Sequence, residues 1–562
     1  MPTLSSILPP ISLASTSGTL TAGSGGTGAT TLTGVVKGNG AGVMTAGTVS
    51  LTTEVSDTLP AGSGGTGLTS SGAVGNLLTS NGTTWESATP APSGPTLTAV
   101  ASGSLGDGSG VIINADGTVS VVASSSSSIG TAAVYNSGSN IFVAASYDPV
   151  SRKVVIAYKN TSSTAGTAVV GTVSGTSISF GTPVVFYSNA TNNIKIINLT
   201  TDQRFVIAFS DVSNTNQGVV IALKVTENSI TFGARVSFNS SVATYDFGLA
   251  HDKATDRVIV AYVNTGNSSF GTALSFTVSD MTITLVGSPV VFSSAFSMNI
   301  TATYNDASKN TLIIYNRTAK VATLTPTSIN FGVAATISGS GNANAPSANY
   351  DSVSQRVVLA YSSAGNSDYG TAVVGTVSGT TVSFGTPVVF HSGTIFYNGM
   401  AATYDAASQR VVIAYRDTNN GSFGTVITGT VSGSAISFAT PVVFNAAVSN
   451  EIGITYSPID QRVVIAYANN ANSGFGTGIT FRAIDTNLTS ENFIGFSSAA
   501  YTNGQTATIQ VVGSVDDAQS GLTPGQSYFV QNNGTLGLAP ANIFAPVFAG
   551  TAVAATKIIV KG

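Results

Sequence analysis

The sequence predicts an all-β protein whose largest part is a seven-bladed β-propeller closed by an N-terminal strand. Two observations support this prediction. A strand-like hexapeptide recurs seven times, and a second motif is offset from it by one repeat: it is missing after the last hexapeptide and has a match before the first. The predicted organisation is a Gly/Thr-rich fibrous stem at residues 1–97, the propeller at 98–487 and a small C-terminal β domain at 488–562.

The hexapeptide is apolar and β-branched throughout, as in Arg462-Val-Val-Ile-Ala-Tyr467. A run without polar alternation is typical of a strand that is buried on both faces. Successive copies begin 46 to 54 residues apart, which is the length of one four-stranded propeller blade. The seven copies begin at Lys153, Arg204, Arg257, Asn310, Arg356, Arg410 and Arg462.

The second motif, Phe180-Gly-Thr-Pro-Val-Val-Phe186 in its first occurrence, follows each of the first six hexapeptides but not the seventh. A match to it, Ile129-Gly-Thr-Ala-Ala-Val-Tyr135, stands before the first hexapeptide. A ring of blades has exposed edges unless it closes, so this N-terminal strand is expected to complete the last blade. Proline in the motif suits an outermost strand, where its missing N–H faces solvent.

The stem contains Gly25-Gly-Thr-Gly28 and Gly64-Gly-Thr-Gly67, followed by Gly75-Asn-Leu-Leu-Thr-Ser-Asn-Gly-Thr-Thr-Trp85. Such segments are too rich in glycine to build a core alone; they are either a flexible linker or ordered by winding around identical chains. The sequences of these segments resemble the shaft repeats of bacteriophage tail fibres. That resemblance implies a homotrimer in the virion, attached through its N-terminus to other virion (tail) proteins, with distal domains presented to the host.

The C-terminal segment after residue 487 leaves the repeat and reads as short strands separated by turn residues, for example Ala507-Thr-Ile-Gln-Val-Val-Gly513. It predicts a small all-β domain. If the ring closes as expected, residues near 128 and near 487 lie in the same blade.

Composition excludes several classes of function. Only 8% of residues are charged, the net charge is −4 and no Lys/Arg cluster is present, so no nucleic-acid partner is expected. No apolar run approaches the roughly 18 to 20 residues that span a bilayer, so no membrane insertion is expected. The chain has no cysteine and its N-terminus does not resemble a secretory signal, which suits a protein assembled in a cytoplasm and released by lysis. Together with the resemblance to tail fibres, this implies a virion protein assembled in the host cytoplasm.

Catalysis is not predicted, and neither a metal nor a cofactor is expected. The two histidines, His251 and His391, have no nucleophile-and-acid arrangement beside them and no metal-ligand spacing. A polysaccharide depolymerase, the less favoured alternative, would need a carboxylate pair, for which Glu227 and Glu451 are the candidates. Most aspartates that recur at one position of the repeat, such as Asp148 and Asp351, precede a strand and are expected to cap turns. We call these the repeat-slot aspartates.

Binding is the predicted activity, because the loops that lead into each first strand and those between the second and third strands are long and variable. Both sets are expected on one face of the propeller. Aromatic rings flanked by amides suit a host surface glycan or another receptor; a purely architectural fibre without receptor contact is the alternative. The candidate receptor-binding residues are Tyr187, Tyr245, Phe247, Phe296, His391, Phe396 and Tyr397.

Overall fold

The computed structural model describes residues 33–38, 42–49, 66, 68, 77–80, 83–88 and 94–561, except 126, 200–202, 240–243, 397, 484 and 542–545. The chain forms two compact units, Met1–Ser93 and Gly94–Gly562. In the first unit, β1 (Val35–Lys37) pairs with β2 (Thr45–Gly47), and β3 (Leu77–Ser80) pairs with β4 (Trp85–Ala88). These short hairpins are largely exposed, and the repeat at 25–28 lies outside the described residues.

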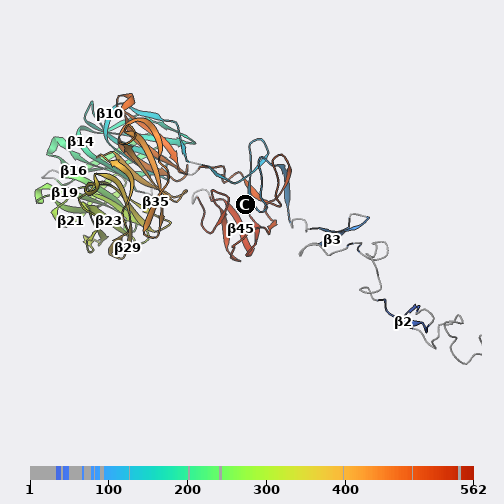
Figure 1. Cartoon of the computed structure of the whole chain (residues 1–562). Helices are drawn as coiled ribbons and strands as arrows, with labels where there is room; N and C mark the ends of the chain where they lie inside the picture. The colour runs from blue at the N-terminus through green and yellow to red at the C-terminus, as the bar shows by residue number, and fades with distance from the viewer. Residues whose placement is uncertain are drawn as a thin grey trace, which may run out of the picture. The chain divides into compact units, whose positions relative to one another are not determined.

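In the described residues between 128 and 482, the strands of the second unit pair into successive antiparallel groups, each with a hexapeptide strand in second position (Figure 1). The groups begin with β10 (Ala133–Asp148), β14 (Val184–Asn198), β18 (Thr244–Asp252), β22 (Thr301–Asn305), β27 (Ala343–Asp351), β32 (Met400–Asp405) and β36 (Val442–Ser457). Their second strands are β11 (Lys153–Asn160), β15 (Arg204–Asp211), β19 (Arg257–Asn264), β23 (Asn310–Tyr315), β28 (Arg356–Ser363), β33 (Arg410–Asp417) and β37 (Arg462–Asn469). Their third strands are β12 (Ala165–Ser174), β16 (Gln217–Thr226), β20 (Phe270–Ser279), β24 (Thr318–Leu324), β29 (Tyr369–Ser378), β34 (Phe423–Ser432) and β38 (Phe475–Arg482).

The fourth strand is formed by the second motif and is interrupted in most groups. Pro183 lies between β13 (Ser177–Phe180) and the start of β14, both of which pair with β12. The other fourth strands are β17 (Ser229–Asn239), β21 (Thr282–Phe296), β25 (Ile329–Phe331) with β26 (Ala335–Thr336), β30 (Thr381–Phe384) with β31 (Val388–Thr394), β35 (Ala435–Phe438) with the start of β36, and β9 (Ser128–Ile129) with the start of β10. Proline therefore lies in the outermost strand or its interruption, where no ladder hydrogen bond is lost.

The hexapeptides form the second strands, and their burial matches the prediction. Val154, Val155, Ile156, Ala157 and Tyr158 are each 0% exposed, so both faces of this strand are covered. Neighbouring groups pack these apolar faces against each other in clusters that combine residues of two successive groups. The repeated burial of β-branched side chains is the main source of stability in this region.

The predicted pairing between the N-terminal strand and the last repeat is present. Ala133 and Val134 of β10 pair with Gly478 and Thr477 of β38. Tyr135 then covers Gly476 so closely that a Cβ there would lie 2.3 Å from the tyrosine ring. In the first group the ring of Phe186 covers Gly166 in the same way, at 2.4 Å. Tyr135 thus occupies the place in the last group that phenylalanine occupies in five others, whereas the fourth group has Ile337 there.

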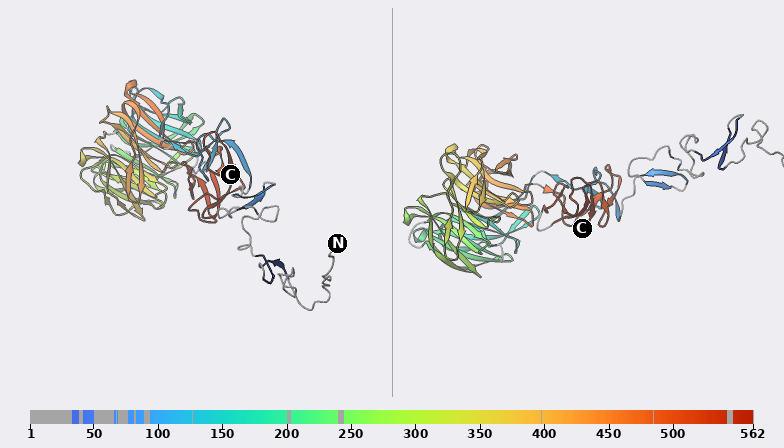
Figure 2. Two further views of the ribbon diagram at one scale, coloured as in Figure 1. Left: turned by 45° about the vertical axis from the view of Figure 1, so that its right-hand side comes forward. Right: turned by 90° about the horizontal axis from the view of Figure 1, so that it is seen from below.

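The first strands lie side by side in a cyclic order. β10 contacts β14, β14 contacts β18, and the series continues through β22, β27 and β32 to β36, which contacts β10 again. Figure 1 and Figure 2 show the corresponding sheets, coloured from cyan to orange, arranged around a common centre. The arrangement is all-β and propeller-like.

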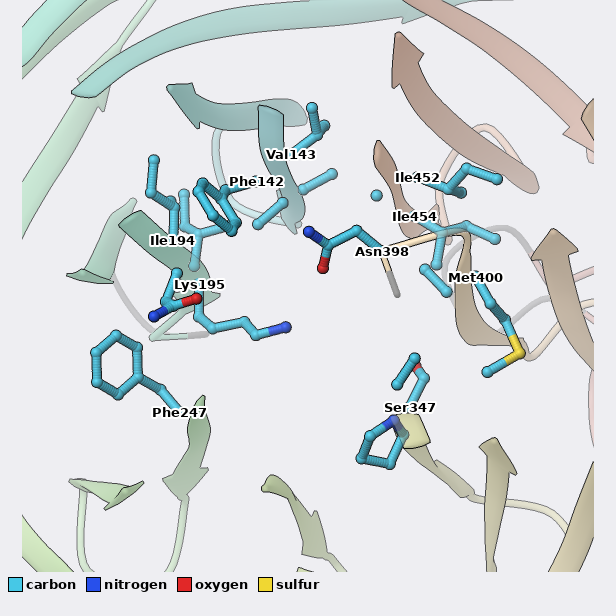
Figure 3. Close-up of a pocket in the computed structure, with 18 of the residues that line it drawn as sticks. Phe142, Val143, Ile194, Lys195, Phe247, Ser347, Asn398, Met400, Ile452 and Ile454 are labelled. Carbon is cyan, nitrogen blue, oxygen red and sulfur yellow. The ribbon is translucent and has the colours of Figure 1, made fainter. Parts of the chain in front are cut away.

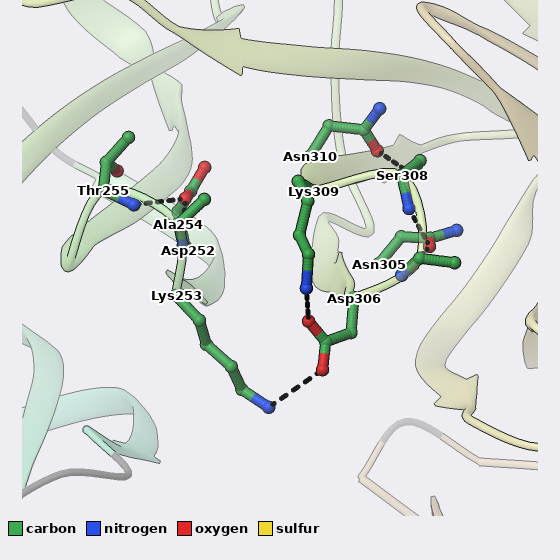
Figure 4. Close-up of polar contacts among 10 residues, drawn as sticks. Asp252, Lys253, Ala254, Thr255, Asn305, Asp306, Ser308, Lys309 and Asn310 are labelled. Carbon is green, nitrogen blue, oxygen red and sulfur yellow. Dashed lines mark hydrogen bonds and ion pairs between the residues drawn. The ribbon is translucent and has the colours of Figure 1, made fainter.

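Turns between first and second strands are capped by the repeat-slot carboxylates, as predicted. Asp252, which is 2% exposed, accepts hydrogen bonds from the backbone N–H groups of Ala254 and Thr255 at 3.0 and 3.1 Å. Asn305 does the same for its own turn (Figure 4). An Asx turn of this kind satisfies two N–H groups with one side-chain oxygen.

Replacing Asp252 with Ala is expected to destabilise the second unit by about 1 to 2 kcal/mol, because two backbone donors lose their acceptor. Asp252→Asn should cost much less, because Asn305 shows that an amide oxygen suffices. The neighbouring Lys253→Met is the control, since its ion pair with Asp306 is long, at 3.9 Å, and half-exposed. Urea denaturation measures all three; equal losses for Asp252→Ala and Lys253→Met would contradict the capping role.

The C-terminal strands form two further sheets. One of these sheets also contains strands that precede the repeat region, which differs from the predicted domain boundaries. β5 (Thr96–Val100), β6 (Gly110–Ile113) and β7 (Val119–Val121) join β40 (Phe493–Ser497) and β41 (Thr506–Gln510) in one sheet. Residues 96–121, predicted to open the propeller, therefore belong with the strands after residue 487. The second sheet contains β42 (Val515–Asp516), β43 (Ser527–Val530), β44 (Leu536–Gly537), β45 (Phe548–Ala554) and β46 (Lys557–Val560).

The chain passes between these sheets and the repeat region through two adjacent strands. Ser124 and Ser125 of β8 (Ser124–Ser125) pair with β39 (Asp485–Thr486). The expectation that residues near 128 and near 487 lie together is confirmed by this pairing and by that of Ile129 with Phe481.

Candidate functional site

The two sets of variable loops lie on one face of the repeat region, as predicted; we call it the loop face. In group after group, a backbone N–H in the connection to the next first strand donates to a carbonyl in the turn between the second and third strands. Examples are Thr244 to Asn216 at 2.9 Å and Ile395 to Asp368 at 2.9 Å. These bonds tie each variable connection to a short turn of the same group, so the loops are held on a rigid support.

A cleft of about 250 Å³ opens on the loop face; we call it the Phe396 cleft. The Phe396 ring is 49% exposed and the guanidinium carbon of Arg416 lies 4.8 Å from its centroid. Such stacking fixes the guanidinium plane and leaves its edge free for polar contacts. The cleft is lined by Ser139, Asn140, Ile141, Phe396, Gly399, Arg416, Asn450, Glu451, Ala468 and Asn470.

Polar groups in the Phe396 cleft are held by their own hydrogen bonds. The Nη1 of Arg416 donates to Oδ1 of Asn450 at 2.8 Å. Oε2 of Glu451 accepts from the backbone N–H of Phe142 at 2.6 Å and from Nδ2 of Asn398 at 3.2 Å. Burial raises the pKa of Glu451, while these two hydrogen bonds and Lys195 act in the opposite direction. An exposed ring next to a guanidinium, amides and a carboxylate is suited to binding a hydroxyl-rich ligand.

The predicted binding residues are found in different environments. Phe396 lines the cleft, and Phe296 is 59% exposed at the end of β21. Tyr187 and Phe247 are buried: the Tyr187 hydroxyl donates to Asp211 at 2.6 Å, and Phe247 packs against Phe238.

The two remaining tyrosines among the candidates are Tyr245 and Tyr397. The backbone of Tyr245 pairs with Val263 in β18, and Tyr397 lies outside the described residues.

Both histidines are interior. His391 is 7% exposed, stacks on Tyr415 with ring centroids 4.9 Å apart and lies 3.7 Å from Asp417. Burial lowers the pKa of His391, and Asp417 opposes this effect. Nε2 of His251 contacts Asp256 at 2.9 Å, within the turn between β18 and β19.

A central cavity of about 210 Å³ is lined by residues of all seven groups, six of them through their first strands and the fourth through Asn299 and Ile300, just before β22 (Figure 3). Each group contributes one residue in the left-handed backbone region, with φ between 46° and 58°, either within its first strand or two residues before it. Most non-glycine residues avoid this region, but Asn and Asp tolerate it. The seven residues are Phe142, Asn193, Asp246, Asn299, Ala345, Asn398 and Glu451.

Lys195 extends from β14 into this cavity (Figure 3). Sequence reasoning missed both Lys195 and Arg416, although each is a charged residue in a slot that other repeats fill differently. Arg416 follows its hexapeptide where Ser210, Val263 and Ala468 follow theirs, and of the other repeats only the first has a charged residue there, Lys159. A comparison of equivalent slots for isolated charges would have found them.

Within the described residues, no group of three or more His, Cys, Asp or Glu side chains is placed to hold a metal ion. Glu227 lies in the turn between β16 and β17, whereas Glu451 lies in β36, so the two candidate carboxylates belong to different groups. Over the same described part of the chain, no helix has the length and apolar character needed to cross a membrane.

Comparisons with known proteins assign no family. No protein-family model matches the chain, and no curated protein matches it. Sqt1 from Saccharomyces cerevisiae is 8% identical with a TM-score of 0.40, over 63% of this chain and 99% of Sqt1. The SapL1 lectin, solved with alpha methyl fucoside, is 12% identical with a TM-score of 0.35, over 55% of this chain and 98% of the lectin. AofleA from Arthrobotrys oligospora is 9% identical with a TM-score of 0.36, over 62% and 98% respectively.

Proposed function

We propose that the chain is a bacteriophage tail-fibre protein whose repeat region, a closed seven-bladed β-propeller, binds a host surface glycan through its loop face. The observation that supports binding is the Phe396 cleft. An exposed ring, a stacked guanidinium and amide groups lie together in it, on loops held in place by backbone hydrogen bonds. The cyclic order of the first strands and the pairing of β10 with β38 support the closed propeller.

The fibre assignment rests on the Gly-Gly-Thr-Gly repeats of the stem and their resemblance to phage shaft repeats. It implies a homotrimer attached through residues 1–97 to other virion proteins. Light scattering of the purified full chain should give three times the mass of one chain; a purely monomeric protein would contradict the trimer.

Binding rather than catalysis is the activity we propose. Glu227 and Glu451 are in different groups, and Glu451 is engaged by the backbone of Phe142 and the amide of Asn398. A glycosidase needs two carboxyl groups flanking one bond.

Arg416→Ala is expected to weaken adsorption of the labelled full-length protein to host cells by about tenfold, because one charge-assisted contact and the stacking on Phe396 are lost. Arg152→Ala is the matched control, since Arg152 is exposed in a turn between first and second strands, away from the cleft. Flow cytometry of cells incubated with each variant measures the effect.

Failure of the wild-type protein to bind cells that adsorb the intact virion would refute a receptor-binding role and favour the architectural alternative. Equal losses for Arg416→Ala and Arg152→Ala would exclude the Phe396 cleft as the binding site.

A further inference from the structure

Among the residues that line the central cavity, Lys195 is the one with a cationic side chain. Its residue is exposed to the solvent of the cavity, and its ammonium has no hydrogen-bond partner among the described residues. Two residues after the left-handed position, where β14 has lysine, the other first strands have Ala144, Gly248, Thr301, Ser347, Met400 and Gly453. The fold therefore does not require a cation in this slot, and six of the seven groups do without one.

Three asparagine amides that line the cavity with Lys195 are each held in place by one internal hydrogen bond. Nδ2 of Asn398 donates to Glu451, and Nδ2 of Asn299 donates to Asn344 at 2.9 Å. Nδ2 of Asn193 donates to Ser210 at 3.3 Å. The amide oxygens that remain can accept hydrogen bonds from a ligand that supplies hydroxyl groups.

The two carboxylates near Lys195 are committed to the backbone. Oδ2 of Asp246 accepts from the N–H of Asn299 at 3.0 Å, and Oε2 of Glu451 accepts from the N–H of Phe142. Although Lys195 is accessible from the cavity, the surrounding protein reduces the solvation of its ammonium and so lowers its pKa, and Asp246 and Glu451 counteract this effect. They balance part of its charge without occupying its donors.

We propose that the central cavity binds an acidic sugar, whose carboxylate accepts hydrogen bonds from Lys195 and whose hydroxyls donate to the surrounding amide oxygens. The polar groups favour this class: the Lys195 ammonium meets the anionic group, and the amides, which can accept or donate hydrogen bonds, meet the hydroxyls. The volume of about 210 Å³ is of the size of one sugar unit.

The cavity and the Phe396 cleft are neighbours, because one segment lines both. Asn398 and Met400 face the cavity, whereas Phe396 and Gly399 line the cleft. An acidic unit in the cavity could continue as a chain into the cleft. In this respect the proposal deepens, and rests on, the proposed glycan-binding function.

Isothermal titration of the full chain with glucuronate and with glucose tests the proposal. Glucuronate should bind about tenfold more tightly than glucose, since only it carries an anion for Lys195. Lys195→Met should remove that preference; methionine has similar length and is the residue at this slot in β32. Lys320→Met, on β24, removes the same charge outside the cavity and should change nothing.

Failure of glucuronate to bind, equal affinity for glucose, or an unchanged preference in Lys195→Met would each overturn the proposal. Thermal melting of both variants separates a folding defect from a binding defect; if Lys195→Met does not fold, Lys195→Gln is measured in its place. Cell adsorption that depends on Arg416 without any glucuronate binding would leave the receptor function intact. Lys195-dependent glucuronate binding without cell adsorption would support the cavity site and contradict the receptor function.

Discussion

Tyr135→Ala is expected to destabilise the second unit by about 3 to 5 kcal/mol, the usual loss for removing a large buried aromatic side chain. Tyr135 is 4% exposed, and its ring lies 5.3 Å from that of Tyr158 and 5.5 Å from that of Phe180. It joins the N-terminal strand to the last repeat through Gly476. Equilibrium unfolding in urea, followed by far-ultraviolet circular dichroism, measures the loss.

A double-mutant cycle with Gly476→Ala makes this prediction specific to closure. Alone, Gly476→Ala should cost about 1 to 3 kcal/mol, because the new Cβ would overlap a ring that neighbouring rings hold in place. In the Tyr135→Ala background that cost should largely disappear, since the space has been vacated. Phe186→Ala with Gly166→Ala is the matched cycle inside the first group, where closure plays no part.

The outcome separates a closed ring from an open one. If the N-terminal strand did not complete the last group, Tyr135 would act as a surface residue and its loss would change stability by less than about 0.5 kcal/mol. No coupling to Gly476 would then be measured, whereas the Phe186–Gly166 cycle would be unaffected.

The repeat region could be predicted because its signals are local. The hexapeptide has the composition of a doubly buried strand, and Asp252 stands where an Asx turn needs an acceptor. The displaced copy that ends at Tyr135 indicated closure, because a fourth strand was missing after Phe475. Each of these features depends on residue type within a few positions.

The first strands were harder to interpret, because their left-handed residues share a conformation but not a side chain. Asn193 and Asn299 are typical of that conformation, whereas Phe142 and Ala345 are not. The surrounding contacts impose it on them, so no sequence pattern marks the ring that lines the cavity.

Long-range pairing and burial account for the remaining differences. Strands at 96–121 pair with strands at 493–510, and neither segment contains a motif that identifies the other. Tyr187 lies in a fourth strand, paired with Gly166, and Phe396 lies in the connection after one; the first is buried and the second half-exposed. Loop aromatics cannot be sorted into packing and binding residues until neighbouring groups are in place.

The second large effect is expected from pH and Asp516 in the C-terminal sheets. Asp516 is 1% exposed at the end of β42. Its Oδ1 accepts from Ala518 and Gln519, whereas its Oδ2 is buried without a partner in the described part of the chain. Burial, with smaller contributions from Asp107 and Asp517, raises the pKa of Asp516 from 3.8 to about 6.

This shift makes the folded state hold a proton that the unfolded chain has released. Between about pH 4 and pH 6 the folded carboxyl is still protonated, whereas the unfolded one is ionised, so raising the pH through this window removes stability. A raised pKa of this size corresponds to about 2 to 3 kcal/mol, which is fully present below pH 4 and lost above pH 6. Hydrogen exchange of the β46 amides, at pH 4.5 and pH 7.5 after correction for intrinsic rates, reports on this sheet.

Asp516→Asn should abolish the dependence, because the amide is neutral at every pH and retains the oxygen that accepts from Ala518. Relative to the wild type, the variant should therefore gain about 2 to 3 kcal/mol of protection on going from pH 4.5 to pH 7.5. Asp517→Asn is the control, since Asp517 is 68% exposed and the same charge is removed one residue away. If both variants follow the wild type in parallel across the window, another group causes the pH dependence, and the buried carboxyl is not the source of the lost stability.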